Sequence, residues 1–261
     1  MGGVIKVSRV STTAFVVISN LDKHNALTCE MWQSLNSEVT KLSSDESLRC
    51  VVIKGDGERA FAAGADISEF DKVRSTHAQV TRYHEEIVGP ALQALLDSRH
   101  VVVASISGIC TGGGLEIAAA CDIRLATPQS RFAAAVARLG FPLAFAETEL
   151  LVRKFGFPFS AELLLEGRIF NADEALQKGF IGRVVREDQL SNETVKIAEN
   201  IALMSPLALH DMKRQLSRLL WDSTPITKRE RENFYSFANS FDYKEGRESF
   251  LQKRRPKFIG K

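Results

Sequence analysis

The chain has 261 residues and a hydrophobic share of 44%, enough to bury the core of one large domain or of one domain with an appendage. Its formal net charge of +2 gives no electrostatic case for nucleic acid as a partner. No apolar run approaches the ~18 residues of a membrane span, and MGGVIKVSRV lacks an apolar signal core, so we expect a cytoplasmic protein that does not associate with membranes.

The first half of the chain alternates apolar strands with helices. We expect strands at VIKV, TAFVVIS and CVVIKG, a helix over residues 28–42 and a long helix over residues 75–96. Further strands are expected at HVVVASI, DIRLAT and FAAA, whereas GDGERAFAAGAD has the composition of a loop. This alternation is typical of an α/β protein with a parallel core.

The last third of the chain is predominantly helical, with short strands near RIF and GRVV. The expected helices cover residues 145–155, 159–166, 172–178, 190–203, 206–220 and 225–240. We therefore predict an α/β core over residues 1–199 and a helical C-terminal region over residues 200–261 that packs against something else.

The cysteines and histidines show no metal-binding pattern. The four cysteines form no C-x-x-C pair, and no two of the five histidines stand at H-x-x-x-H spacing. The cysteines lie in apolar stretches, which favours small core residues, and we expect no metal site.

Three consecutive glycines, Gly112, Gly113 and Gly114, stand where the chain is expected to pass from a strand into a helix. Glycine is costly in backbone entropy, so the run indicates a conformation or a close approach that other residues exclude. Glu116 follows within CTGGGLEIAAAC, among residues that otherwise look like core. At this turn, glycines that let another group approach the backbone closely therefore stand beside a single carboxylate.

A glycine-rich turn at the start of a helix is typical of three kinds of site. A dinucleotide site is disfavoured, because the spacing is not G-x-G-x-x-G and no acidic residue ends a following strand. A structural role remains open, since a glutamate in the first turn interacts well with the positive end of a helix. The third is an oxyanion hole, in which backbone N–H groups stabilise an enolate oxygen beside Glu116 as base or acid. A second N–H donor would then come from FAAGADI, residues 61–67.

FAAGADISEF and GICTGGGLEIAAACDIRLA together resemble the two signature regions of the crotonase family, also called the enoyl-CoA hydratase/isomerase superfamily. The similarity extends from DKHNALT to EGRESFLQKRRPKF and so covers nearly the whole chain. It implies an α/β fold with a crotonase-like ββα spiral core and C-terminal helices that build a homotrimer or a hexamer of two trimers. It also implies an acyl-CoA thioester substrate and no separate cofactor, since coenzyme A is part of the substrate.

The resemblance also implies roles for individual residues. The catalytic positions are the N–H groups of Ala65 and Gly113, as oxyanion donors, and the carboxylate of Glu116. The substrate-binding and CoA-binding positions are Ala63, Gly64, Asp66, Ile67, Gly112, Val136, Phe237, Phe250 and Lys253. Of these, the loop around Ala63 would cradle the adenine end of CoA. Lys253 would lie near the CoA phosphates, and the two phenylalanines would flank the acyl or pantetheine region.

One position departs from the typical hydratase pattern. Hydratases of the family carry a second catalytic glutamate in a motif like FGQPEILLG, and the stretch here is FAAAVARLG (132–140), which places Val136 at that glutamate. Arg138, two residues on, either faces solvent or holds an acidic acyl group. Glu147 and Glu149 either face solvent, the commoner arrangement near a helix N-terminus, or one of them points back into the pocket.

The leading hypothesis is an enoyl-CoA hydratase-type lyase that works through an enolate held in an oxyanion hole. One alternative is an enoyl-CoA double-bond isomerase that uses Glu116 alone. Another is a non-catalytic acyl-CoA-binding protein. The pocket for the acyl group is expected to be lined by residues 70–95 and by neighbouring subunits, and the sequence does not predict which acyl group it takes.

Overall fold

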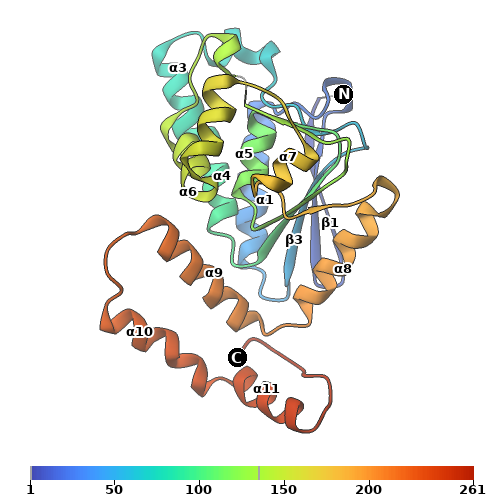
Figure 1. Ribbon diagram of the computed structural model, residues 1–261, viewed down its shortest axis with the longest axis vertical. Coiled ribbons are helices and arrows are strands. Elements are labelled where there is room, and N and C mark those ends of the chain that lie inside the picture. Colours follow the sequence, from blue (N-terminus) through green and yellow to red (C-terminus); the bar gives the residue numbers. More distant parts are fainter. Residues whose placement is uncertain (1, 135) are drawn as a thin grey trace.

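The computed structural model describes residues 2–134 and 136–261, so Ala135, the last residue of the predicted FAAA strand, lies outside the described residues. The larger of two sheets has the strand order β1-β2-β3-β5-β7-β10 (Figure 1). β1 and β2 pair antiparallel, and the other neighbours in this sheet pair parallel. Its strands are β1 Val4–Val10, β2 Thr13–Ser19, β3 Cys50–Gly55, β5 Val101–Ile106, β7 Ile123–Ala126 and β10 Arg183–Val184.

A smaller sheet with the order β4-β6-β8-β9 lies beside it. Its strands are β4 Ala60–Ala62, β6 Ile109–Thr111, β8 Arg131–Ala133 and β9 Phe170–Asn171. β4 pairs parallel with β6, and β6 with β8, so the carboxyl ends of all three strands lie at one edge. β4 corrects the sequence prediction of a loop over GDGERAFAAGAD: its three residues are buried and pair with β6.

Helices cover both faces of the larger sheet. On one face lie α1 Cys29–Ser44, α4 Gly89–Leu96 and α5 Gly113–Ala120, which enclose the main core. On the other face α8, Leu190–Ala202, buries Ile197, Ala198 and Ile201 against strand residues such as Val52 and Val103. The remaining helices are α2 Phe70–Val73, α3 His77–Arg82, α6 Phe145–Ala161, α7 Ala172–Gln177, α9 Pro206–Trp221, α10 Lys228–Phe234 and α11 Phe241–Leu251.

α1 forms as its sequence pattern predicts. The side chain of Thr28 caps it by accepting a hydrogen bond of 3.2 Å from the backbone N–H of Met31. Met31, Leu35 and Val39 recur at helical spacing and are buried against the core.

The predicted helix over residues 75–96 is interrupted. Thr76 and Gln79 form a capping box at the start of α3, a single π-helical segment follows at Tyr83–Val88, and α4 continues from Gly89. A π-helical turn widens the helix by one residue and is frequent at functional sites. Here it places Tyr83 and His84 in the wall of a cavity.

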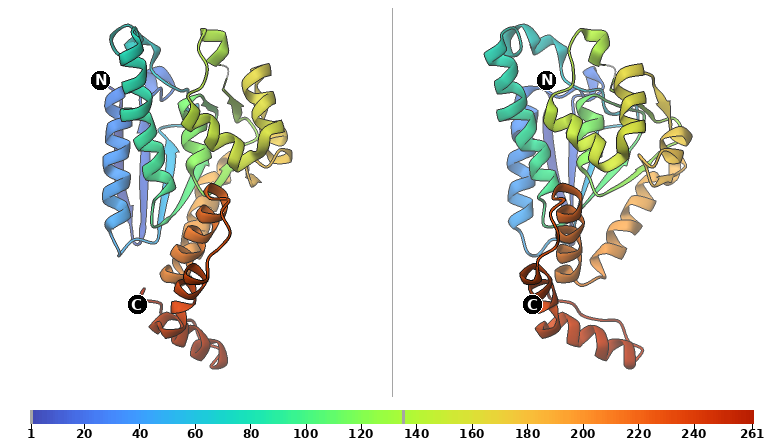
Figure 2. Two further views of the ribbon diagram at one scale, coloured as in Figure 1. Left: turned by 90° about the vertical axis from the view of Figure 1, so that its left-hand side faces the viewer. Right: turned by 60° about the vertical axis from the view of Figure 1, so that its left-hand side comes forward.

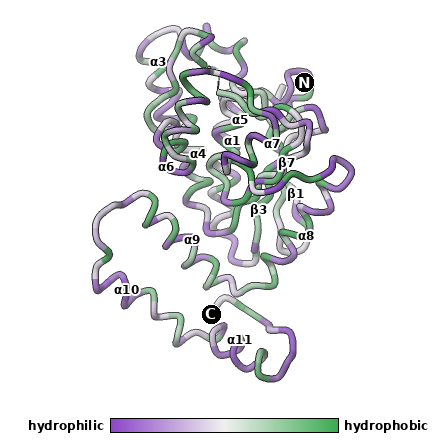
Figure 3. The backbone as a smooth tube through the Cα atoms, in the orientation of Figure 1, coloured by the Kyte–Doolittle hydropathy of each residue, from purple (hydrophilic) through white to green (hydrophobic). Residues whose placement is uncertain are grey.

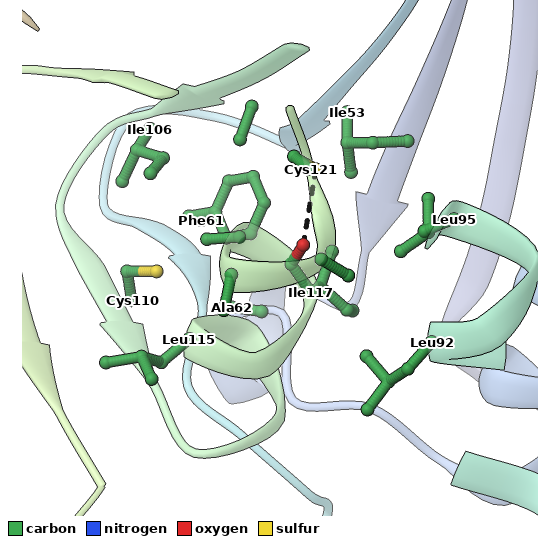
Figure 4. Close-up of a cluster of buried hydrophobic side chains, with 14 of the residues drawn as sticks. Ile53, Phe61, Ala62, Leu92, Leu95, Ile106, Cys110, Leu115, Ile117 and Cys121 are labelled. Carbon is green, nitrogen blue, oxygen red and sulfur yellow. Dashed lines mark hydrogen bonds between the residues drawn. The ribbon is translucent and has the colours of Figure 1, made fainter. Parts of the chain in front are cut away.

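α5 runs through the middle of the molecule, and all eight of its residues are buried. Figure 4 shows Leu115 and Ile117 of this helix among Phe61, Ala62 and Cys110 of the smaller sheet and Leu92 and Leu95 of α4. The thiol of Cys121 donates to the carbonyl of Ile117 at 3.2 Å. Cys50, Cys110 and Cys121 are buried and free, as the sequence predicts for small core residues.

α9, α10 and α11 extend away from the α/β body (Figures 1 and 2). The sequence predicts a single helix over residues 225–240. The chain instead forms α10, a 3₁₀ segment at Tyr235–Asn239, and then α11, a helix for which the sequence gives no prediction. Hydrophobic segments recur along these helices (Figure 3), and none of the residues of α9 is buried. None of the helices formed by residues 2–134 and 136–261 combines the length and apolar character of a membrane span.

Candidate active site

The glycine turn lies at the edge where β6 ends. Gly112 has φ +50° and ψ −123°, a backbone conformation that only glycine adopts readily, and it precedes the first residue of α5. A Cβ atom on Gly113 would lie 2.6 Å from the Trp32 ring, and one on Gly114 would lie 2.3 Å from the carbonyl oxygen of Ala62. The three glycines are therefore required by conformation at the first position and by close packing at the other two.

The loop after β4 lies directly against this turn. A Cβ atom on Gly64 would lie 3.3 Å from the carbonyl oxygen of Thr111, and the hydroxyl of Thr111 donates to the carbonyl oxygen of Ala63 at 3.0 Å. Leu27 holds the loop from the other side, because its N–H donates to Gly64 at 2.7 Å and its carbonyl accepts from Asp66 at 2.8 Å. The parallel pairing of β4 and β6 thus brings two segments about fifty residues apart into contact.

Two backbone N–H groups are left available where these segments meet. Within residues 2–134 and 136–261, neither the N–H of Ala65 nor that of Gly113 donates a hydrogen bond, although both residues line one cavity. The N–H of Gly113 is also the first of α5, where the helix dipole favours negative charge. Two free N–H groups at the end of a helix are what an oxyanion hole requires, so the arrangement is compatible with the role that the family resemblance implies for Ala65 and Gly113.

The carboxyl group of Glu116 lies one turn into α5 and faces the same cavity with 6% of its surface exposed. Burial, followed by the nearby carboxyl of Glu147, raises the pKa of Glu116 to about 8, while the guanidinium of Arg74 opposes the shift. A carboxyl group with a pKa near neutrality can both accept and return a proton, which suits it to acid–base catalysis.

The cavity has a volume of about 310 Å³. It is lined by Trp32, Ala63, Gly64, Ala65, Ile67, Phe70, Arg74, Tyr83, His84, Val88, Thr111, Gly112, Gly113, Glu116, Ala133, Val136, Arg138, Leu139, Phe141, Leu143 and Ile169. Most of the residues that the sequence analysis singled out are therefore gathered in one place, on the ends of parallel strands.

The model of the family described as enoyl-CoA hydratase/isomerase matches residues 9–261. The chain belongs to the enoyl-CoA hydratase/isomerase family. The short-chain-enoyl-CoA hydratase of Clostridium acetobutylicum is 30% identical over 243 residues, which cover 93% of this chain and 92% of the relative. The crotonyl-CoA hydratase of Syntrophomonas wolfei is 29% identical over 249 residues, 95% of either chain.

A solved structure from Magnetospirillum magneticum, described as an enoyl-CoA hydratase/carnithine racemase, superposes with a TM-score of 0.96 at 37% identity. The match covers 99% of this chain and 96% of that one. These comparisons confirm the predicted crotonase-like α/β fold of this enoyl-CoA hydratase/isomerase family member, whereas assembly into trimers stays a prediction.

Four of the residues predicted to contact the substrate or CoA do not line the cavity described above. The carboxylate of Asp66 bonds Ser68 at 2.7 Å and Lys23 at 2.7 Å, which holds the loop rather than facing the cavity. Phe237 and Phe250 line a separate cavity formed by α9, the 3₁₀ segment and α11, and Lys253 is exposed after α11. The contacts of these four residues with CoA stay predictions. Within one chain, the structure does not bring Phe237, Phe250 or Lys253 to the glycine turn.

The two glutamates of α6 have different surroundings. Glu149 is half exposed and pairs with Arg153 at 2.7 Å, so it follows the solvent-facing alternative. Glu147 is 1% exposed, and its Oε1 bonds Nδ1 of His84 at 2.8 Å. It points inward but stands behind His84 and does not line the cavity, whereas Val136 does. Among the described side chains that line the cavity, Glu116 is therefore the only carboxyl group.

The stretch 70–95, which the sequence predicts as part of the acyl pocket, contributes five residues to the cavity, none of which stands out in the sequence by itself. Phe70, Arg74, Tyr83, His84 and Val88 all line the cavity, although Tyr83 and His84 depend on the π-helical turn, which has no clear sequence signal. Across residues 2–134 and 136–261, no three His, Cys, Asp or Glu side chains gather in a way that could hold a metal ion.

Proposed function

We propose that this protein adds water to the double bond of a 2-enoyl-CoA thioester. The observation that carries the proposal is the meeting of three groups in one cavity: the backbone N–H groups of Ala65 and Gly113, which donate to no described residue, and the buried carboxyl group of Glu116. The names of the relatives support the substrate class, because both act on short enoyl-CoA esters according to those names. Coenzyme A enters as part of the substrate, and the proposal needs no further cofactor.

The thioester oxygen accepts hydrogen bonds from Ala65 and Gly113, which draw electron density away from the β-carbon. Ionised Glu116 takes a proton from a water molecule as its oxygen bonds to that carbon, and the negative charge moves to the thioester oxygen as an enolate. Glu116 then returns the proton to the α-carbon, and the carbonyl re-forms. One carboxyl group thus transfers the proton twice, and the net change is the addition of water across the double bond.

The single carboxyl group makes this scheme more demanding than one with two acids. Val136 can neither donate nor accept a proton, so Glu116 alone must both activate the water and protonate the α-carbon. Glu147 contributes from outside the cavity, because its carboxyl raises the pKa of Glu116 and makes that group a stronger base when it is ionised. We therefore expect turnover below that of an otherwise equal site with two acids.

The test is hydration of crotonyl-CoA, followed by loss of the conjugated enoyl absorbance. Glu116→Gln keeps the size and polarity of the side chain and should lower kcat by about 10²–10⁴-fold. Glu149→Gln is the matched control on the exposed face of α6 and should leave the rate unchanged. Binding of crotonyl-CoA without any turnover in the wild type would contradict the proposal and favour a non-catalytic acyl-CoA-binding protein.

The second candidate function is double-bond isomerisation of an enoyl-CoA. Val136 in the cavity wall favours it, because moving a double bond needs only one group that removes a proton from one carbon and returns it to another. Incubation with 3-hexenoyl-CoA distinguishes the two reactions. A gain of conjugated absorbance that depends on Glu116, together with no hydration of crotonyl-CoA, would replace hydration by isomerisation.

A further inference from the structure

Arg74 stands in the wall of the cavity and is enclosed by aromatic rings. Its guanidinium carbon lies 4.4 Å from the ring centre of Phe70, 4.8 Å from that of Tyr83 and 4.3 Å from that of Phe141. Contacts at these distances attract a cation to the ring faces and restrict its orientation. The guanidinium is thus held rigidly at the cavity, at the junction of α2, the π-helical turn and the segment before α6.

His84 and Glu147 orient this guanidinium further. A guanidinium nitrogen of Arg74 lies 3.2 Å from Nε2 of His84, and Nδ1 of the same ring lies 2.8 Å from Oε1 of Glu147. Because a guanidinium only donates hydrogen bonds, Nε2 must be the acceptor and Nδ1–H the donor to the carboxyl group. This row of hydrogen bonds from Arg74 through His84 to Glu147 therefore uses one N–H group of the guanidinium. The other guanidinium N–H groups can donate to a bound ligand.

That positive charge has no direct counter-ion in the described part of the chain. None of the ion pairs within residues 2–134 and 136–261 includes Arg74, and the carboxyl group of Glu147 is separated from it by the imidazole. Arg74 is partly buried, and burial lowers the pKa of its guanidinium. Holding a charge in an apolar wall without a counter-ion is unfavourable, so the site is complementary to an anion. Arg138 lines the same cavity and likewise makes no ion pair with a described residue.

We propose that the cavity takes acyl-CoA substrates whose acyl group carries a carboxylate at its far end, and that Arg74 binds this carboxylate. The inference rests on the proposed function, which places the thioester oxygen between Ala65 and Gly113. Arg74 lines the same cavity as Glu116 and the two N–H groups, which puts it near the acyl end of the substrate rather than at the phosphates of CoA. The planar fork of a guanidinium matches the two oxygens of a carboxylate.

Two other acyl classes fit this wall less well. An acyl group with a quaternary ammonium would suit an aromatic cage, but Arg74 already occupies the cage and repels a second cation. A purely aliphatic acyl group would leave the guanidinium without an anion after water has been expelled. Both classes become outcomes of the same experiment.

The experiment compares kcat/KM for glutaconyl-CoA with that for 5-methylhex-2-enoyl-CoA, in which an uncharged isopropyl group of similar size replaces the carboxylate. We expect the wild type to favour glutaconyl-CoA by at least about tenfold, the usual worth of a charge-assisted hydrogen bond. Arg74→Gln should abolish this preference and Arg74→Lys should retain part of it, whereas Arg153→Gln on the exposed face of α6 should leave it intact. Arg138→Gln shows whether the second arginine contributes.

Equal rates for the two substrates in the wild type, or a preference for the aliphatic one or for crotonobetainyl-CoA, would overturn the proposal. An equal decrease of kcat/KM for both substrates in Arg74→Gln would also overturn it. That result would mean that Arg74 supports folding or adjusts the pKa of Glu116 and does not bind the carboxylate of the acyl group. Calorimetric binding of glutaryl-CoA against 5-methylhexanoyl-CoA needs no turnover. If the protein binds glutaryl-CoA more tightly but converts neither enoyl ester, the role of Arg74 in binding the carboxylate is supported and the proposed hydration is refuted.

Discussion

At the scale of single residues, the chemistry of this site depends on what surrounds Glu116. The carboxyl group is buried on α5, faces the cavity and has two charged neighbours of opposite effect, Glu147 and Arg74. Burial raises its pKa most, and the neighbours adjust the result. The same residue is therefore a weak acid in the resting protein and a competent base only after it has lost its proton.

This environment predicts a pH profile. If Glu116 is the base, kcat/KM for crotonyl-CoA should rise with pH through about 8, which is the pKa of Glu116 in the folded protein. Glu147→Gln removes a neighbour that raises this pKa, so the midpoint should move to lower pH. Arg74→Gln removes one that lowers it, so the midpoint should move to higher pH. The prediction fails if both variants keep the wild-type midpoint, with Glu149→Gln as the control for a carboxyl group lost elsewhere on α6.

Glu116 also predicts a pH dependence of stability. Its pKa is about 8 in the folded protein and near 4.5 in the unfolded chain, so its protonated form is the one that folding favours. The contribution of the protonated group is complete below pH 4.5 and is lost as the pH rises toward about 8.

Relative to Glu116→Gln, the free energy of unfolding of the wild type should therefore fall by about 1.4 kcal/mol per pH unit across this window. Urea unfolding of both proteins at several pH values measures the difference. A difference that does not change with pH would mean that Glu116 is ionised in the folded protein at neutral pH.

At the scale of elements, the glycine turn joins β6 to α5 and lies against the loop that follows β4. Gly112 supplies the backbone conformation and Gly114 supplies the contact with Ala62 that lets α5 lie against β4. The N–H of Gly113 is presented to the cavity because both neighbours allow the helix to begin there. The proposed oxyanion hole would thus depend on how β4, β6 and α5 meet rather than on any one side chain.

Gly112→Ala should destabilise the protein by about 1–3 kcal/mol, because a residue with a Cβ is strained at φ +50°. Gly114→Ala should destabilise at least as much, since its Cβ would overlap a backbone carbonyl at 2.3 Å. Gly182→Ala is the control, because its nearest neighbour to an added Cβ is 3.6 Å away. Midpoints of urea unfolding report all three. A Gly112→Ala midpoint equal to that of Gly182→Ala would contradict the strain argument.

At the scale of the whole molecule, α9, α10 and α11 leave a large apolar surface uncovered in a single chain. On α9, Met212, Leu216 and Leu219 recur at helical spacing, and the two leucines are 70% and 65% exposed. Phe250 on α11 is 84% exposed. Monomeric proteins rarely leave so much continuous apolar surface in water. We propose that these helices pack against other copies of the chain, in the trimer or hexamer that the family resemblance implies.

Leu216→Glu places a charge in the centre of this apolar stripe and should shift the protein to a smaller oligomer, measured by light scattering after size exclusion. Leu176→Glu is the control, because Leu176 is similarly apolar but lies on α7, in the α/β body. A wild type that is monomeric at all concentrations would refute the proposed assembly. It would also leave Phe237, Phe250 and Lys253 without a route to a CoA molecule bound at the glycine turn.

The sequence by itself determined the α/β class, the helix over α1, the glycine turn and the place of Glu116, because these features follow from local patterns: hydrophobic period, capping and the special conformations of glycine. Its resemblance to a known family also pointed to Ala65 and Val136, which both line the cavity, because each lies in a contiguous signature segment. It did not anticipate β4 or α11, whose short patterns are weak on their own and form through contacts with distant parts of the chain.

Only the tertiary structure decided which charged side chains meet at the site. Glu147 and Glu149 are two residues apart on one helix and look alike in sequence, yet one bonds His84 inside and the other bonds Arg153 at the surface. Arg74, His84 and Glu147 come from three separate elements, and their contact depends on a π-helical turn and on the packing of α6. Side-chain direction and long-range packing carry no local signature, which is why the charge environment of Glu116 required the folded structure.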